Sequence, residues 1–165
     1  MKKTVSFVAA SSNSGKTTLI EKIVSILKKR GLRVAVVKHA SAGFDLDKSG
    51  KDSWRFQQAG ADSVILVGPG QIALIRKVKH EPLPEEIDLL TADADVVLIE
   101  GFRKSVKNKI EVFRHHVSGE YPLCLSDPSY IALASDKPFP VSIPQFDLND
   151  AEGIASFLQA NVGTP

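Results

Sequence analysis

The sequence predicts an α/β fold in which helices flank a mostly parallel sheet, with a β-hairpin extension. Two apolar runs, Val5–Ala10 and Arg33–Lys38, enclose a stretch of helical periodicity. So short a strand–helix–strand unit places both strands parallel in one sheet with a right-handed crossover. The apolar run at 95–100 is typical of another buried strand. Turn residues separate the apolar runs 63–67 and 72–76, which favours the hairpin.

The first helix is predicted over Lys16–Lys29, because its apolar residues recur at three- and four-residue steps and Gly31 follows as a helix stop. Residues 39–51 are rich in Ser, Gly and Asp and have no clear period, so we interpret them as a long loop of the kind that is often functional. Further helices are expected at 52–59, 84–90 and 150–160, and further strands at 110–113 and 130–134.

Length and composition indicate one ordinary globular domain spanning residues 1–165, with 43% hydrophobic and 24% charged residues. The net charge of +2 is too small to argue for a nucleic-acid partner. The single cysteine, Cys124, excludes an intrachain disulfide and a cysteine-based metal site. The first apolar run stops at Ser11 instead of continuing as a signal peptide would. No segment reaches the roughly 18 apolar residues of a membrane span, so we expect a cytoplasmic protein without a membrane partner.

The loop at 10–17 matches the phosphate-binding pattern G-x-x-x-x-G-K-[ST] except at its first position, Ala10. Gly15 lets the backbone approach phosphate oxygens, and Lys16 places an ammonium on the β- and γ-phosphates. Thr17 offers a hydroxyl to Mg²⁺ at a helix N-terminus, which favours anions. The first position only shapes the turn out of the strand, so alanine leaves this chemistry intact.

This pattern predicts a P-loop NTPase-like fold that binds a purine nucleoside triphosphate with Mg²⁺. The alternative is an ordinary turn that carries Gly-Lys-Thr by chance. We favour the phosphate loop because a buried strand ends where it starts and an amphipathic helix begins at the lysine. The residues expected to bind the nucleotide here are Ser12, Asn13, Ser14, Gly15, Lys16, Thr17 and Thr18.

Carboxylates elsewhere are candidates for the metal. Glu100 ends a predicted strand, and in P-loop proteins a carboxylate at this place reaches Mg²⁺ or its water shell. The alternative is an exposed acid at a strand end. Asp45 in the long loop is a second candidate beside Mg²⁺, which takes oxygen ligands. Other loop residues that could line this region, or equally be solvated, are His39, Asp47, Lys51 and Asp52.

Asp136 is the candidate for reading the base. It follows a predicted strand, and its carboxylate could accept hydrogen bonds from the N1 and N2 donors of guanine, an arrangement that adenine cannot satisfy. The segment resembles the N/T-K-x-D motif of GTP-binding proteins, although the spacing differs. The doublet His115-His116, interpreted as lying on a strand, would point to opposite faces and is expected to be structural. A basic stretch could meet an anionic ligand or be a solvated face: Arg103, Lys104, Lys107, Lys109 and Arg114.

Several stretches together resemble the molybdopterin-guanine dinucleotide biosynthesis adaptor family. They keep the family's order and approximate spacing from residue 5 to residue 102, and the segment after Lys38-His39 is the most distinctive. The stretches are Ser14–Leu19, Val36–His39, Asp45–Lys48, Gly50–Ser53, Ala59–Ala61 and Val97–Phe102, with weaker matches at Lys109–Val112 and Phe146–Leu148. The departure is Ala10, where the family usually has glycine.

The resemblance implies GTP and Mg²⁺ as ligands, at most slow GTP hydrolysis, and a homodimer. It also implies partnership with the guanylyltransferase that joins GMP to molybdopterin, and it leaves open whether molybdopterin itself is bound. By resemblance, residues 15–18 hold phosphate and Mg²⁺, Glu100 lies on the metal side, and the segment Asp45–Ser53 forms the nucleotide-side loop.

The leading hypothesis is therefore a GTP-binding adaptor with weak hydrolysis, whose hairpin around 68–70 adds a strand across a dimer interface. One alternative is a small-molecule kinase using the same loop. It would need an arginine-rich lid, and the basic stretch, the only candidate, resembles a strand instead. A second alternative is a metallochaperone GTPase, which the cysteine content disfavours because a soft-metal relay uses cysteine clusters.

Overall fold

The computed structural model of the protein describes residues 3–103 and 108–161. The chain forms two compact units: residues 1–39 with 84–165, and residues 40–83. Each unit has its own packing, and the single domain expected from the sequence stays a prediction.

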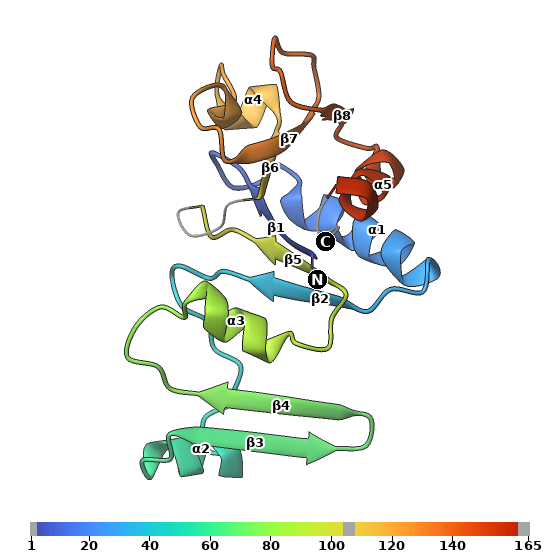
Figure 1. Cartoon of the computed structure of the whole chain (residues 1–165). Helices are drawn as coiled ribbons and strands as arrows, with labels where there is room; N and C mark the ends of the chain where they lie inside the picture. Colours follow the sequence, from blue (N-terminus) through green and yellow to red (C-terminus); the bar gives the residue numbers. More distant parts are fainter. Residues whose placement is uncertain (1–2, 104–107, 162–165) are drawn as a thin grey trace. The chain divides into compact units, whose positions relative to one another are not determined.

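The first unit is built on a six-stranded sheet in the order β2-β5-β1-β6-β7-β8, in which every neighbouring pair is parallel (Figure 1). The strands are β1 (Lys3–Val8), β2 (Val34–Lys38), β5 (Val96–Glu100), β6 (Lys109–Phe113), β7 (Tyr130–Ser135) and β8 (Gln145–Asp147). β1 and β2 are parallel in one sheet, as the strand–helix–strand pattern predicts, but β5 lies between them. The prediction of an α/β fold with a parallel sheet is confirmed.

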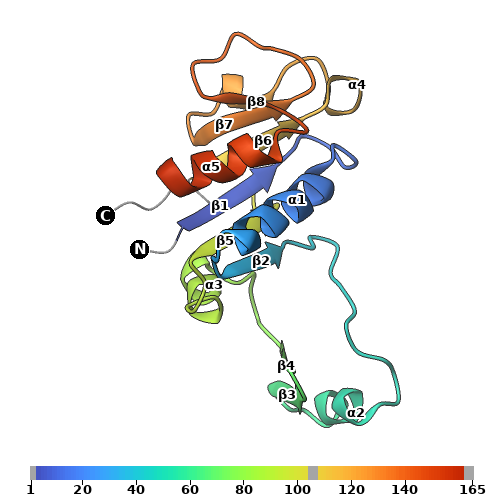
Figure 2. The ribbon, with the colours of Figure 1, turned by 90° about the vertical axis from the view of Figure 1, so that its right-hand side faces the viewer.

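Helices cover both faces of this sheet because successive residues of a buried strand point to opposite sides. In β5, Val96 and Leu98 pack with α1 (Lys16–Lys29) and α5 (Ala151–Asn161) in the larger apolar core. The alternate residues, Val97 and Ile99, pack with α3 (Pro84–Leu90) in the smaller one. Figure 2 shows α1 and α5 side by side on one face of the sheet. The apolar period read from 16 to 29 is the buried face of α1.

The second unit consists of α2 (Asp52–Gln58) and an antiparallel hairpin of β3 (Ser63–Gly68) and β4 (Gln71–Arg76). The predicted hairpin is confirmed, with Gly68 paired to Gln71 at its turn. One face of the hairpin carries four exposed aliphatic side chains, since Ile65 pairs with Leu74 and Val67 with Ile72.

Three short elements were not predicted: α4 (His115–Ser118), a 3-10 turn at Leu123–Leu125, and β8. The first strand also ends at Val8, two residues before the predicted end. Among the described residues, no helix has both the length and the apolar character that crossing a bilayer requires.

Candidate phosphate-binding site

The loop at 9–15 leaves the carboxyl end of β1, between β5 on one side and β6 on the other, and enters α1 (Figure 1). Asn13 and Gly15 have positive φ angles of 59° and 94°. A left-handed backbone at the residue before the helix suits glycine, because residues with a Cβ rarely adopt it. This is the strand–loop–helix context on which the phosphate-loop prediction depends.

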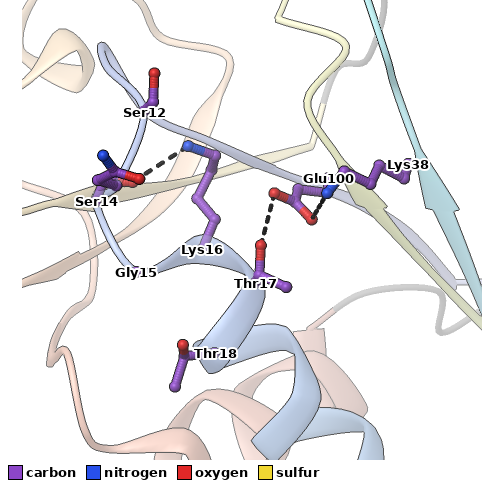
Figure 3. A pocket seen from close by; sticks show the side chains of 9 residues that line it. Ser12, Ser14, Gly15, Lys16, Thr17, Thr18, Lys38 and Glu100 are labelled. Atoms are coloured by element: carbon purple, nitrogen blue, oxygen red, sulfur yellow. Dashed lines mark hydrogen bonds and ion pairs between the residues drawn. The ribbon is translucent and has the colours of Figure 1, made fainter. Parts of the chain in front are cut away.

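A pocket of about 480 Å³ opens at this loop. In Figure 3 the side chains of Lys16 and Thr17 rise from the start of α1, and Glu100 reaches Thr17 from β5. The pocket therefore brings together the loop, the strand-end carboxylate and the end of β2. Its lining residues are Ser12, Asn13, Ser14, Gly15, Lys16, Thr17, Thr18, Lys38 and Glu100.

Lys16 lies over its own loop. Its Nζ donates to the Ser11 carbonyl oxygen and to the Ser14 Oγ, each at 3.2 Å, and the Ser14 side chain is fully buried. Burial lowers the pKa of Lys16 below its ordinary value; Glu100 opposes this shift and Lys38 adds to it. A partly desolvated ammonium gains more from an arriving anion than one in free solvent.

Glu100 joins the loop to the neighbouring strand. Thr17 Oγ1 donates to Glu100 Oε1 at 2.9 Å, and Lys38 Nζ lies 3.8 Å from Glu100 Oε2. The sheet register fixes these neighbours, because Glu100 pairs with Phe7 of β1 and with Lys38 of β2. Only 16% of the Glu100 side chain is exposed, against 67% for Lys38.

The residue after Glu100 must be small. Gly101 has a φ of 102°, and a Cβ there would lie 3.0 Å from His39 Cβ. The Gly101 N–H donates to the Phe7 carbonyl at 3.0 Å, and Ser6 Oγ donates to the Gly101 carbonyl. These contacts hold the end of β5 beside β1, and Glu100 is held with it.

The donor set fits a triphosphate with Mg²⁺. A hydroxyl and a carboxylate oxygen 2.9 Å apart are hard oxygen ligands of the type that Mg²⁺ takes, alone or through water, together with phosphate oxygens. Lys16, the amides at the start of α1 and the positive end of that helix favour anions in the same pocket.

The pocket does not test two other predicted site residues, Asp136 and Asp45. Both carboxylate oxygens of Asp136 accept the N–H of His115, at 3.0 and 3.2 Å, and Asp136 does not line the pocket. Its role in reading guanine stays a prediction. Asp45 lies in the second unit, so its metal role is likewise untested. In that unit Asp47 accepts from Ser53 Oγ and Gln57 Nε2, which gives it a structural task.

The basic stretch does not behave as one surface. Lys109 is buried, lies 3.3 Å from Asp127 and stacks over the Tyr130 ring, so it is neither a solvated residue nor free for a ligand. Lys104 and Lys107 lie outside the described residues. The premise used for His115-His116 was wrong, because both residues begin α4 and not a strand. A four-residue helix is too short for its period to be read from the sequence.

Sequence reasoning gave Lys38 no role, although it named the next residue, His39, as one that could line this region. The structure makes it a lining residue paired with the candidate metal ligand. The signal was available, since a lysine that ends a strand parallel to β1 emerges at the carboxyl edge of the sheet, where ligands bind.

Comparison with known proteins identifies a family for the chain. Residues 4–136 match the family described as molybdopterin guanine dinucleotide synthesis protein B. The molybdopterin-guanine dinucleotide biosynthesis adapter protein of Escherichia coli K12 is 36% identical over 157 residues, covering 91% of this chain and 88% of the relative. The adapter protein of Haemophilus influenzae is 35% identical over 153 residues, covering 90% and 83%.

Solved structures give the same result. A crystal structure of molybdopterin-guanine biosynthesis protein B superposes with a TM-score of 0.68 at 31% identity, covering 95% of this chain and 98% of the other. Bacillus subtilis MobB superposes with a TM-score of 0.74 at 25% identity, covering 99% of each chain. The sheet, the hairpin and the matched sequence together show that this chain belongs to the molybdopterin-guanine dinucleotide synthesis protein B family.

Proposed function

We propose that this chain binds GTP with Mg²⁺ and serves as an adaptor in molybdenum cofactor biosynthesis, with at most slow GTP hydrolysis. The observation that carries the proposal is a single pocket that gathers Lys16, Thr17 and Glu100 at the start of α1. These are the three side-chain functions that triphosphate binding with a divalent cation requires. Membership of the family supports the biosynthetic role.

Each residue has a defined task. The backbone amides of the loop would surround the phosphates, and Lys16 would leave its carbonyl and hydroxyl acceptors for phosphate oxygens. The Thr17 hydroxyl and Glu100 would hold Mg²⁺, directly or through water. When bound, the cation neutralises negative charge on the phosphates. The exposed Lys38 ammonium can then turn from Glu100 toward the anion, because its partner would face the metal.

The lining of the pocket supports slow hydrolysis. Within the described part of the chain, Glu100 is the sole carboxylate among the lining residues, and Thr17 and Lys38 already engage it. A residue that orients the attacking water is a standard component of fast GTPases. The described lining residues therefore support holding the nucleotide more than turning it over quickly.

The proposed partner is the guanylyltransferase that joins GMP to molybdopterin. Two relatives carry the name molybdopterin-guanine dinucleotide biosynthesis adapter protein, and the word adapter supports a role beside an enzyme of that synthesis. In this proposal GTP loading marks the state of the adaptor that meets the enzyme.

A homodimer is part of the same proposal, with a second copy covering the hairpin. Ile65, Val67, Ile72 and Leu74 share one face of β3 and β4 and are 38% to 77% exposed. A two-stranded hairpin is marginally stable alone, and its edge strands offer unpaired backbone groups to another strand. A twofold interface would cover the same apolar face on both copies.

Nucleotide titrations test the binding part. The purified protein is titrated with fluorescent GTP and ATP analogues, with Mg²⁺ and with EDTA, and phosphate release is followed separately. We expect tighter binding of GTP in the presence of Mg²⁺ and slow phosphate release. Preference for ATP, with turnover that depends on a small acceptor molecule, would contradict the adaptor hypothesis and favour a small-molecule kinase.

Two further measurements test the assembly. Pull-down with the guanylyltransferase in the apo, GDP and GTP states should show a nucleotide-dependent complex, and its absence in all three states contradicts the adaptor role. Sedimentation should show a dimer that Val67→Asp, in the hairpin face, dissociates. Leu90→Asp, on the exposed side of α3, is the matched control and should leave the dimer intact.

A further inference from the structure

The exposed side chain of Arg114 reaches the phosphate loop from the side opposite Glu100. Its Nη2 lies 3.5 Å from the position that a Cβ on Gly15 would occupy. Arg114 directly follows β6, and β6 pairs with β1 up to Val8 and Glu111, so the end of β6 runs beside the start of the loop. The loop therefore has β5 with Glu100 on one flank and β6 with Arg114 on the other.

The backbone around Arg114 is fixed from several directions. Its carbonyl accepts the N–H groups of Val117 and Ser118, and its own N–H donates to the Ser118 Oγ at 3.1 Å. The next N–H, of His115, donates to Asp136. Ser11, inside the phosphate loop, donates its Oγ to the Val117 carbonyl at 2.9 Å. The turn that carries Arg114 is thus bonded to the loop itself.

The guanidinium of Arg114 has no acidic partner in the described part of the chain. Over residues 3–103 and 108–161, no carboxylate lies within ion-pairing distance of it, whereas Lys38 has Glu100 and Arg33 has Asp95. Lys16 also has acceptors within its own loop. The five donors of a guanidinium have a fixed geometry that matches phosphate oxygens. A guanidinium without an acidic partner, next to a loop of amide donors, is therefore well placed to bind an anion.

We propose that Arg114 is a phosphate-binding residue of the GTP site, contacting the non-terminal phosphates on the flank away from Mg²⁺. This inference rests on the proposed nucleotide binding. Loop amides surround the α- and β-phosphates, while Lys16 reaches the β- and γ-phosphates. A guanidinium beside Gly15, on the β6 side, lies on the flank of the loop away from Thr17 and Glu100. Its contribution is therefore the same for GTP and GDP and independent of the metal.

The test titrates four variants with GTP and GDP, each with Mg²⁺ and with EDTA. The variants are Arg114→Ala, Arg114→Lys, Lys29→Ala and Lys16→Ala. Arg114→Ala should lower the affinity for both nucleotides by on the order of tenfold to a hundredfold, as expected for a lost charge-assisted contact. The loss should be equal with and without Mg²⁺. Arg114→Lys keeps the positive charge but lacks the planar guanidinium with its paired donors, so it should recover part of the affinity. Lys29→Ala removes one exposed positive charge at the far end of α1 and should bind as the wild type does.

The outcomes separate this inference from the proposed function. Lys16→Ala should weaken binding at least about tenfold in every condition, because one charged contact with phosphate is lost. If it does while Arg114→Ala binds normally, or loses affinity only with Mg²⁺, the role of Arg114 is overturned and the nucleotide site stands. If the wild type binds neither nucleotide, both proposals fail. Thermal melting of each variant checks the fold, and an Arg114→Ala protein that melts normally but binds weakly supports the assignment.

Discussion

Glu100→Gln separates metal binding from phosphate binding, because it removes one charge and keeps the side-chain shape. The amide oxygen of the variant can still accept the Thr17 hydroxyl, so the 2.9 Å hydrogen bond becomes neutral and does not disappear. The variant also loses the ion pair between Glu100 and Lys38, whose charged atoms are 3.8 Å apart. The Lys38 side chain is 67% exposed, so solvent screening limits the contribution of this pair to stability to under about 1 kcal/mol. The loss of charge assistance in the hydrogen bond adds about 1 kcal/mol. The melting temperature should therefore fall by only a few degrees.

The effect on the metal should be larger. A residue that ligates Mg²⁺, or orients the hydroxyl that does, typically contributes about tenfold or more to metal affinity. The assay is titration with GTP in Mg²⁺ and in EDTA, and the quantity compared is the ratio of the two affinities. We expect that ratio to fall about tenfold, while affinity in EDTA is unchanged or higher because a negative charge beside the phosphates is gone. A ratio equal to that of the wild type refutes the assignment of Glu100 to the metal.

Three other predictions concern the scaffold. Leu98→Ala empties a fully buried site in β5 and should cost about 2–5 kcal/mol in urea unfolding, whereas Leu89→Ala, 79% exposed, should cost under about 0.5 kcal/mol; equal costs would contradict the core assignment. Hydrogen bonds from Arg33 hold the pKa of Asp95 at about 2, below its ordinary 3.8, so this stabilisation is complete above pH 3.8 and is lost as pH falls toward 2. When the free energy of unfolding in urea is measured between pH 2 and 6, Asp95→Asn should therefore reduce its fall at low pH. An unchanged fall would count against the Arg33–Asp95 pair. Burial raises the pKa of the Cys124 thiol to about 12, so a thiol reagent at pH 8 should react slowly with the folded protein and rapidly in urea, and equal rates would show that the thiol is accessible.

The phosphate loop could be predicted because its chemistry is local. Gly15, Lys16 and Thr17 are consecutive, and the strand before them and the helix after them have clear apolar patterns. Glu100 could be predicted as a strand-end carboxylate, because the carboxyl ends of parallel strands share one edge of the sheet. Its pairing with Lys38 depends on register between strands that are far apart in the chain.

The rest of the site depends on contacts that the sequence does not encode locally. Arg114 reaches Gly15 only because β6 lies beside β1, on the side away from β5. Lys109 looked like a member of a basic surface, yet its strand takes it into the interior, where Asp127 compensates the charge. Asp136 followed a predicted strand end, but its carboxylate oxygens are used by a backbone N–H of α4, an element too short to show a period.

The most direct test of the account is calorimetric titration of Mg²⁺-GTP into the wild-type protein and into Lys16→Ala, with melting curves recorded for both. The account predicts saturable binding at one site per chain for the wild type. The variant should melt normally and bind at least about tenfold more weakly, because one charged contact with phosphate is lost. Wild-type affinity in a folded Lys16→Ala protein would contradict the claim that this loop holds the triphosphate.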